Sequence, residues 1–123
     1  MKGFYDLEVW KTCRQFKNKI IKIARTFPKE EQYRLLDQAV RSSRSINANI
    51  SEGQGRFHYQ ENIQFCRQAR GSLTETLNHM IDAYDEKYIS KQQLKEIKDE
   101  YSQCLKLING YIAYLKKRKD EDL

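Results

Sequence analysis

Apolar residues recur at steps of three and four in four segments of the chain, which is the spacing of an amphipathic helix. The pattern predicts helices over residues 5–26, 29–52, 58–87 and 91–118. Helices of this length joined by short turns favour an all-α, up-down-up-down antiparallel four-helix bundle, with residues 1–123 as one domain. The clearest apolar seam is that of the last helix, which carries Leu94, Ile97, Tyr101, Cys104, Ile108, Tyr111 and Leu115.

Residues at the segment boundaries predict where the helices begin and end. Pro28 ends the first helix, because the residue before a proline is pushed out of the helical region. Gly53 and Gly55 are expected to end the second helix. Ser90 and Gln93 have the spacing of a capping box, in which each side chain accepts a backbone N–H of the other residue. The fourth helix is therefore expected to begin directly after Ser90.

The second predicted helix has small and polar side chains where a bundle helix is normally apolar. Its predicted inner face consists of Tyr33, Leu36, Val40, Ser43, Asn47 and Ile50. Small residues of the third helix, among them Gly71 and Ser72, are natural neighbours for Ser42 and Ser43 at a close helix crossing. Gly71 costs about 1 kcal/mol in a helix interior, so we expect a packing reason for it.

A polar stripe also follows the second helix, and it consists of Gln38, Arg41, Ser45, Asn49 and Glu52. These side chains are mostly short or forked, which suits hydrogen bonds at close range. One interpretation is that they meet their symmetry mates in an oligomer and fix its register. The other is contact with a ligand. Glu75 of the third helix is expected to be a half-buried hydrogen-bond partner for a serine or arginine of the second helix.

The charge of the chain is concentrated in its first half. The net charge is +6, and eight of the nine arginines lie within residues 1–70. The guanidinium group matches phosphate in geometry, so a basic half predicts an anion-binding surface. The alternative is a solvated face whose cations form ion pairs with Glu52, Glu61 or Glu75. The candidate nucleic-acid-binding residues are Lys11, Arg14, Lys22 and Arg25 of the first helix, followed by Arg41, Arg44 and Arg56.

Other features of the sequence bear on ligands and location. No apolar run approaches the ~20 residues of a membrane span, and the N-terminus lacks the apolar core of a signal peptide, so we expect a cytoplasmic protein. Phe57 and Tyr59 could stack on bases or pack beneath a neighbouring helix. The charged segment 116–122 is expected to be frayed and solvated.

Catalytic, metal and cofactor sites are not indicated. Cys13, Cys66 and Cys104 lack the paired spacing of zinc ligands and are expected to be buried as small apolar groups. His58 and His79 lie far apart on one predicted helix and cannot meet within a protomer. A nucleophile with its base, or a di-iron site, would need such partners. We therefore expect a binding protein and not an enzyme, without a cofactor.

Several stretches of this sequence together resemble the 23S rRNA-intervening sequence protein family. The resemblance begins at Phe4–Trp10, continues through Phe27–Glu31 and is densest between Gln38 and Arg56. Asn47 departs from the family pattern, which usually has proline there, and Arg44 replaces an apolar residue. The matching residues of the dense region and the third helix are Gln38, Arg41, Ser45, Ile46, Asn49, Ile50, Glu52, Gly53, Gly55, Arg56, Phe65, Ala69, Gly71, Ser72, Leu73 and Glu75.

The resemblance implies a bacterial helical bundle that assembles as a ring-like homopentamer. It also implies a tie to ribosomal RNA genes, and a related bundle serves as an accessory factor of a reverse transcriptase. Two hypotheses follow. In the first, an oligomeric accessory protein binds RNA or DNA through its basic surface. In the second, the bundle is a protein–protein interaction or scaffolding module whose charge is incidental. Binding to phosphate should weaken steeply with salt, whereas apolar docking should not.

Overall fold

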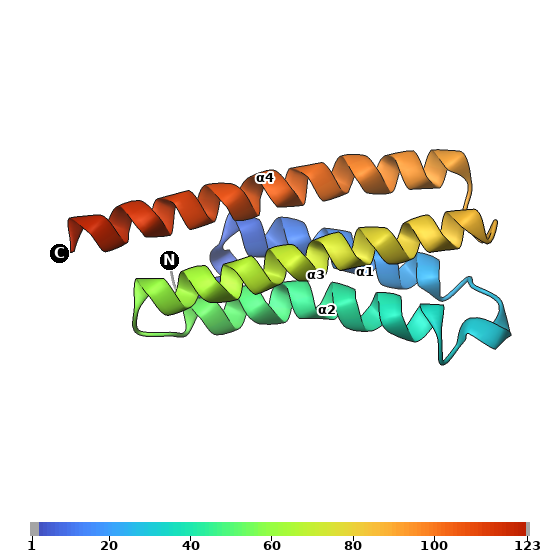
Figure 1. The fold of residues 1–123 in the computed structure, drawn as a ribbon, viewed down its shortest axis with the longest axis horizontal. Helices are drawn as coiled ribbons and strands as arrows, with labels where there is room; N and C mark the ends of the chain where they lie inside the picture. Colours follow the sequence, from blue (N-terminus) through green and yellow to red (C-terminus); the bar gives the residue numbers. More distant parts are fainter. Residues whose placement is uncertain (1–2, 123) are drawn as a thin grey trace.

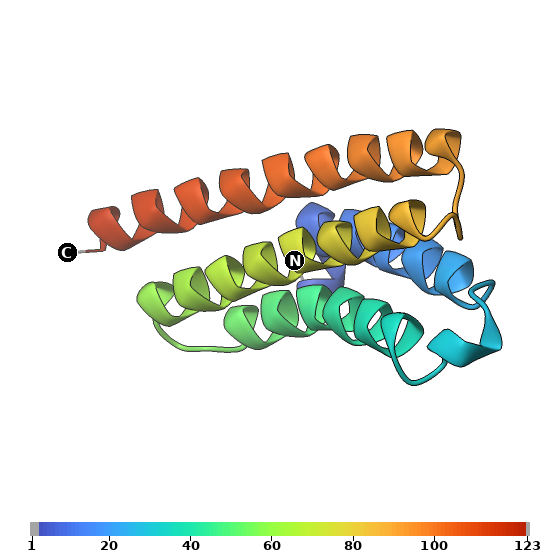
Figure 2. The ribbon, with the colours of Figure 1, turned by 45° about the vertical axis from the view of Figure 1, so that its right-hand side comes forward.

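The computed structural model describes residues 3–122, which form an antiparallel four-helix bundle (Figure 1). The all-α bundle predicted from the sequence is confirmed. The α1–α2 and α3–α4 connections lie at one end of the bundle, and the α2–α3 hairpin lies at the other (Figures 1 and 2). The helices are α1 (Glu8–Ala24), α2 (Leu35–Gln54), α3 (Tyr59–Asp85) and α4 (Lys91–Glu121), with the short 3-10 helices η1 (Phe4–Asp6) and η2 (Lys29–Glu31).

The core follows the apolar seams of all four helices. Phe16, Ile46, Leu73 and Ile108 are each at most 1% exposed, and they come from α1, α2, α3 and α4 in turn. Burying side chains of this size contributes roughly 1.5–3 kcal/mol each. The amphipathic periodicity therefore translates directly into the packing of the bundle.

The three cysteines are buried and free of disulfide bonds. Cys13 of α1 and Cys104 of α4 are distant in sequence but neighbours in the core. A hydrogen bond with the Cys104 thiol, together with burial, raises the pKa of Cys13. Burial raises the pKa of Cys66 to about 11. All three side chains thus act as small apolar groups in the core.

The segment between α1 and α2 differs from the predicted helix 29–52. The backbone at Arg34 (φ −122°, ψ −108°) is not helical, so α2 begins only at Leu35. The Glu31 carboxylate accepts the N–H of Leu35 at 3.4 Å and the phenol O–H of Tyr88 at 2.8 Å. Glu31 therefore caps α2 and ties η2 to the α3–α4 connection.

This break changes which residues of α2 enter the core. Leu35 and Ala39 are buried, whereas Leu36 and Val40 are only partly buried. Tyr33, which was predicted on the inner face, is 86% exposed because it precedes the first turn of α2. The predicted inner face is thus wrong at its beginning and holds from Ser43 onward.

The other helix ends differ from prediction by a few residues. Leu7 is extended (φ −68°, ψ 130°), so α1 begins at Glu8 and not at residue 5. The capping box before α4 is confirmed, since Gln93 N–H donates to Ser90 Oγ at 3.0 Å and Ser90 N–H donates to Gln93 Oε1 at 2.8 Å. The charged segment 116–122 is helical through Glu121, which corrects the expectation of a frayed tail.

Small polar side chains line the contact between α2 and α3, the most extensive of the bundle. Thr76 Oγ1 lies 2.8 Å from Ser42 Oγ and 2.8 Å from the carbonyl oxygen of Ser72. One helical turn away, Ser72 Oγ donates to Ser45 Oγ at 3.0 Å. These hydroxyl groups satisfy one another, which allows a polar seam to be buried without a large penalty.

The glycines of α2 and α3 have roles other than those predicted. Gly53 does not end α2 but lies buried within it, and no described glycine has a positive φ. A Cβ atom at Gly53 would lie 2.8 Å from Phe65 Cβ, so the absence of a side chain permits the close approach of α3. Gly71 is exposed with nothing within 4 Å of the corresponding position, so the expected packing reason is wrong.

Candidate functional site

Three basic side chains lie near enough for their charges to act on one another where α1 lies beside α2. Arg14 and Lys17 come from α1, and Arg44 comes from α2. Burial and the positive charges of Arg14 and Arg44 lower the pKa of Lys17. Lys17 is partly buried, and it forms no ion pair with any carboxylate of residues 3–122. The three residues are therefore a cluster of like charges held together by the packing of the two helices.

The surroundings of this cluster fix its position. The Arg14 guanidinium lies over the Trp10 ring, 5.6 Å from its centroid. The carbonyl oxygen of Trp10 accepts a hydrogen bond of 3.0 Å from Asn47 Nδ2, which holds α2 against α1. Asn47 is only 6% exposed, so this bond is shielded from water. Asn47, which stands where the resembled family usually has proline, thus connects the two helices that carry the cluster.

The remaining basic candidates of the first helix continue the cluster along α1. Lys11, Lys22 and Arg25 are exposed: Lys11 lies three residues before Arg14, Lys22 lies eight residues after it, and Arg25 lies three residues after Lys22. Together with the cluster they form what we name the α1–α2 basic surface, which consists of Lys11, Arg14, Lys17, Lys22, Arg25 and Arg44. α1 itself carries five basic residues and one acidic residue, Glu8. Sequence reasoning missed Lys17, although its position three residues after Arg14 was a usable signal.

Arg41 and Arg56 have carboxylate partners and stand apart from this surface. Arg41 Nε lies 3.3 Å from Asp37 Oδ2 on an outward side of α2. Arg56 lies at the α2–α3 hairpin, with nitrogens 3.0 Å from Glu52 Oε1 and 3.8 Å from Glu61 Oε2. These ion pairs lower the attraction of either arginine for a further anion. Lys19 of α1 also has a carboxylate partner. Its hydrogen bond with Glu100 raises the pKa of Lys19.

The polar stripe of α2 divides between the interior and the surface. Asn49 Nδ2 donates to the Ser45 carbonyl oxygen at 2.9 Å and to Ser45 Oγ at 3.0 Å. Both residues are half-buried in the α2–α3 contact and have partners within their own chain. Gln38 and Glu52 are exposed, and Glu52 pairs with Arg56. Two of the candidate oligomer contacts are therefore already engaged within the protomer.

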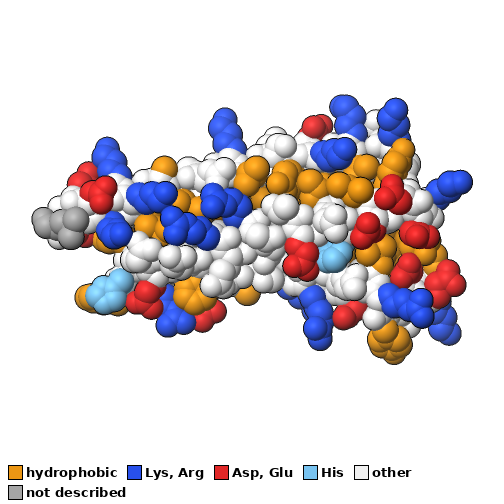
Figure 3. Space-filling model, in the orientation of Figure 1, with side chains coloured by type: hydrophobic (Ala, Val, Ile, Leu, Met, Phe, Trp, Pro, Cys, Tyr) orange, Lys and Arg blue, Asp and Glu red, His pale blue; other side chains and the backbone are white. Residues whose placement is uncertain are grey.

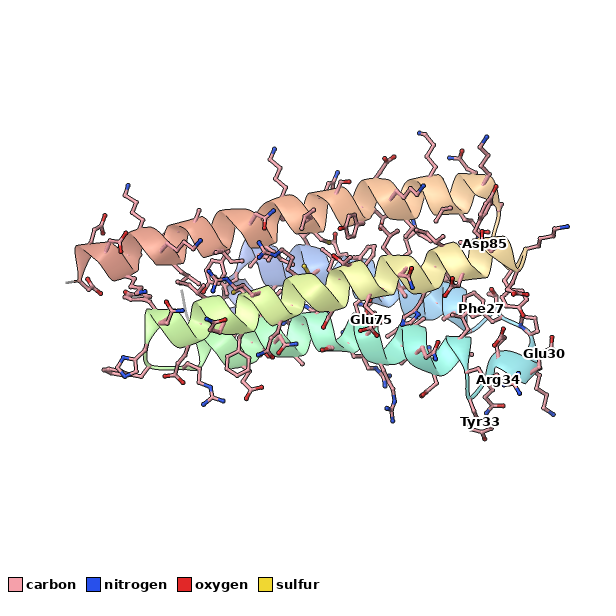
Figure 4. All side chains as sticks on the ribbon, viewed as in Figure 1. Phe27, Glu30, Tyr33, Arg34, Glu75 and Asp85 are labelled. Carbon is pink, nitrogen blue, oxygen red and sulfur yellow. The ribbon has the colours of Figure 1, made fainter. Side chains whose placement is uncertain are left out.

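Glu75 does not reach α2. Its side chain is 60% exposed, and its Oε2 atom lies 3.1 Å from His79 Nε2 (Figure 4). The expected half-buried hydrogen bond to a serine or arginine of α2 is wrong. A spacing of four residues places Glu75 and His79 on one side of α3, and the nearer polar partner is the imidazole.

Acidic residues gather at the end of the bundle that holds the α1–α2 and α3–α4 connections. Glu30 and Asp85 lie there with Tyr33 and Arg34 (Figure 4), and the space-filling view shows several acidic side chains at this end (Figure 3). Glu86 is the next residue after the end of α3 at Asp85. Lys29, Arg34 and Lys87 lie on the same two connections, so this end of the bundle carries side chains of both charges.

A cleft opens at the opposite end of the bundle. α1 begins only at Glu8, whereas α4 continues to Glu121. The first turns of α3 and the last turns of α4 therefore extend beyond the start of α1 (Figure 1). The space between them has a volume of about 1140 Å³. Its walls come from the start of α1, the α2–α3 hairpin and the last turns of α4. The sequence alone could not reveal it, because three separate segments form it.

Four aromatic side chains, Phe57, Tyr59, Tyr111 and Tyr114, line this cleft. Phe57 of the hairpin is 91% exposed and Tyr114 of α4 is 54% exposed. Phe57 therefore does not pack beneath a neighbouring helix of its own chain. The Tyr111 and Tyr114 rings are stacked, with centroids 6.1 Å apart, and Tyr111 Oη accepts a hydrogen bond of 3.2 Å from Asn62 Nδ2.

Two further properties of residues 3–122 bear on function. No group of three or more His, Cys, Asp or Glu side chains lies where it could hold a metal ion. None of the helices in this range has both the length and the apolar character needed to cross a bilayer. His58 and His79 lie at the start and in the last third of α3, separated by about 30 Å of helix.

Comparison with known proteins identifies a family and similar solved structures. The sequence model of the 23S rRNA-intervening sequence proteins matches residues 5–110. A crystal structure of a protein of unknown function from the S23 ribosomal protein family of Bacteroides thetaiotaomicron is similar, with a TM-score of 0.77 and 22% identity. The alignment covers 85% of this chain and 97% of that one, and at this identity it shows a common fold. No curated protein matches the sequence.

Proposed function

Because the chain belongs to the 23S rRNA-intervening sequence protein family, we propose that it binds the phosphate backbone of RNA or DNA through the α1–α2 basic surface. The family name states a relation to ribosomal RNA and no biochemical role. We propose binding without catalysis, as an accessory protein in the cytoplasm.

The observation that carries this proposal is the Arg14–Lys17–Arg44 cluster. The lowered pKa of Lys17 means that its charge is disfavoured by burial and by the two arginines. A phosphate group placed between these side chains would relieve that repulsion and form charge-assisted hydrogen bonds. A merely solvated face would instead spread its cations apart or pair them with carboxylates, as Lys19 is paired with Glu100.

We also propose that the bundle assembles into an oligomer, a homopentamer by family resemblance. Apolar side chains form a band over the α3–α4 contact in Figure 3. Leu77, Ile81, Tyr101 and Leu105 are only partly buried within the protomer, so a second copy could cover them. An oligomer would repeat the basic surface and raise the apparent affinity for a long polyanion.

The test is fluorescence anisotropy of labelled duplex DNA and structured RNA with nuclease-treated protein across a salt series. If the six cations of the basic surface each neutralise one phosphate, the logarithm of affinity for duplex falls by about 5 per tenfold rise in salt. The Lys17→Ala/Arg44→Ala variant is expected to lessen that slope by about 2.

A matched control removes the same charge elsewhere. Lys95 and Lys106 are exposed on α4, so Lys95→Ala/Lys106→Ala is expected to leave the slope nearly unchanged. Light scattering checks that the variants keep the oligomeric state of the unchanged protein. Equal slopes for both variants would refute the assignment of the surface. Absence of binding at low salt would refute nucleic-acid binding and favour the scaffolding hypothesis.

A further inference from the structure

The end cleft combines exposed aromatic rings with cations that lack carboxylate partners. Phe57 and Tyr114 offer ring surface to solvent from the hairpin and from α4. An exposed phenylalanine contributes nothing to the stability of its own chain by burial. Its position on the wall of a cleft leaves the ring accessible to a ligand.

The last turns of α4 bring two cations to the rim of the cleft, which the carboxylates Glu8 and Asp122 also line. Lys119 Nζ donates to Gln60 Oε1 at 2.7 Å, an uncharged partner. A hydrogen bond with the Tyr59 phenol raises the pKa of Arg118, so Arg118 lies at the same rim. No carboxylate of residues 3–122 lies within ion-pair distance of Lys119 or Arg118, although the charge of Asp122 adds to the rise in the pKa of Arg118. This charge complements a phosphate that enters with an attached aromatic group.

We propose that this cleft binds unpaired bases of a single-stranded nucleic-acid segment, with Phe57 and Tyr114 as stacking surfaces and Lys119 and Arg118 as phosphate contacts. Bases stack on aromatic side chains without regard to sequence, because every base has a flat π surface. The volume of about 1140 Å³ exceeds that of a typical small-ligand site, so more than one nucleotide can enter. The amide groups of Gln54 and Gln60 line the cleft and offer hydrogen bonds to base edges.

This inference rests on the proposed function, since it extends the same ligand from the basic surface to the cleft. The cleft lies beside the start of α1, and Lys11 and Arg14 of the basic surface lie next to that start. Asn47 lies level with Trp10 through their hydrogen bond, and α2 covers the distance from Asn47 to Gln54 in about 10 Å. A strand whose phosphates follow the α1–α2 basic surface can therefore reach the cleft with its next nucleotides.

The experiment compares a short single-stranded oligonucleotide with an abasic oligonucleotide of equal length and charge. Both bind the phosphate contacts, but only the first can stack. The protein is expected to bind the base-containing strand at least about tenfold more tightly, as expected for loss of one or two stacked bases. Phe57→Ala/Tyr114→Ala is expected to abolish this difference while its affinity for duplex DNA stays unchanged.

The control variant removes exposed aromatic rings at the opposite end of the bundle. Tyr33 is 86% exposed and Tyr84 is 37% exposed, so Tyr33→Ala/Tyr84→Ala is expected to keep the full preference for bases. Phe57→Trp, which retains a stacking ring, is expected to keep it as well. Circular dichroism verifies the helical content of each variant.

Different results separate the failure of this inference from the failure of the proposed function. Equal affinity of the unchanged protein for both strands overturns the cleft assignment while duplex binding still stands. A preference for bases that survives in Phe57→Ala/Tyr114→Ala also overturns it. A third result also overturns it. If the unchanged protein shows no preference for bases and Phe57→Ala/Tyr114→Ala no longer self-associates, the cleft binds a second copy of the chain. Loss of duplex binding itself refutes the proposed function.

Discussion

Replacing Gly53 with alanine is expected to destabilise the bundle, whereas the same change at Gly71 is expected to stabilise it. Both glycines lie inside helices, so alanine is the better helix former at both by about 1 kcal/mol. They differ in what the new methyl group would meet. At Gly53 it would lie 2.7 Å from Asn62 Oδ1 and 2.8 Å from Phe65 Cβ, and at Gly71 it would meet nothing within 4 Å.

The magnitude follows from these contacts. Neither neighbour of Gly53 can move easily, because Asn62 is 7% exposed and holds Tyr111, and Phe65 Cβ is attached directly to the α3 backbone. Overpacking of this kind costs typically about 1–3 kcal/mol. After the gain in helix propensity, Gly53→Ala is expected to lose up to about 2 kcal/mol. Gly71→Ala is expected to gain about 1 kcal/mol, or roughly 4 °C in Tm.

Urea unfolding followed by circular dichroism, at one protein concentration, measures both changes. Gly110 supplies a second control, because it also has open space around it and lies inside α4. Gly110→Ala is expected to stabilise the protein as Gly71→Ala does. If Gly53→Ala proves as stable as these two variants, the close approach of α3 to α2 does not depend on Gly53 and the reasoning fails.

Three further outcomes are expected. Thr76→Val removes the hydroxyl next to Ser42 and is expected to cost about 1–2 kcal/mol by urea unfolding, while an unchanged midpoint would contradict a role for that buried bond. A hydrogen bond to Glu31 raises the pKa of Tyr88 to about 12, so the folded state keeps a proton that the unfolded state loses above about pH 10. Stability should therefore fall between pH 10 and 12, and fall less in Tyr88→Phe, as thermal unfolding across that range would reveal. Cys66, with its pKa raised to about 11, and the other two buried thiols should resist Ellman's reagent at neutral pH until urea unfolds the chain, so rapid labelling of the folded protein would contradict their burial.

The helical periodicity was sufficient to predict the four helices and their antiparallel order. The capping box at Ser90 could be predicted too, because it depends only on residues three apart. The prediction failed for the start of α2, where a tertiary contact decides the structure. Glu31 bonds to Tyr88, which is distant in sequence, and this contact ends η2 before α2 begins.

The candidate site was only partly predictable for a similar reason. Spacing identified Arg14 and Arg44 as basic positions, but the approach of Lys17 to both requires knowing how α1 packs on α2. Spacing did indicate an ion pair at Arg56, since Glu52 lies four residues before it, and the structure confirms that Arg56 pairs with Glu52 and Glu61. The cleft beside Phe57 depends on the relative lengths of α1 and α4, which the pattern of each helix does not contain.

The most direct test of the α1–α2 basic surface is lysine acetylation with and without bound duplex DNA, read by mass spectrometry. Duplex is expected to protect Lys11, Lys17 and Lys22 of α1 and to leave Lys95 and Lys106 of α4 as reactive as in the free protein. Bound duplex that protects the α4 lysines instead, or protects none of the α1 lysines, would contradict the account.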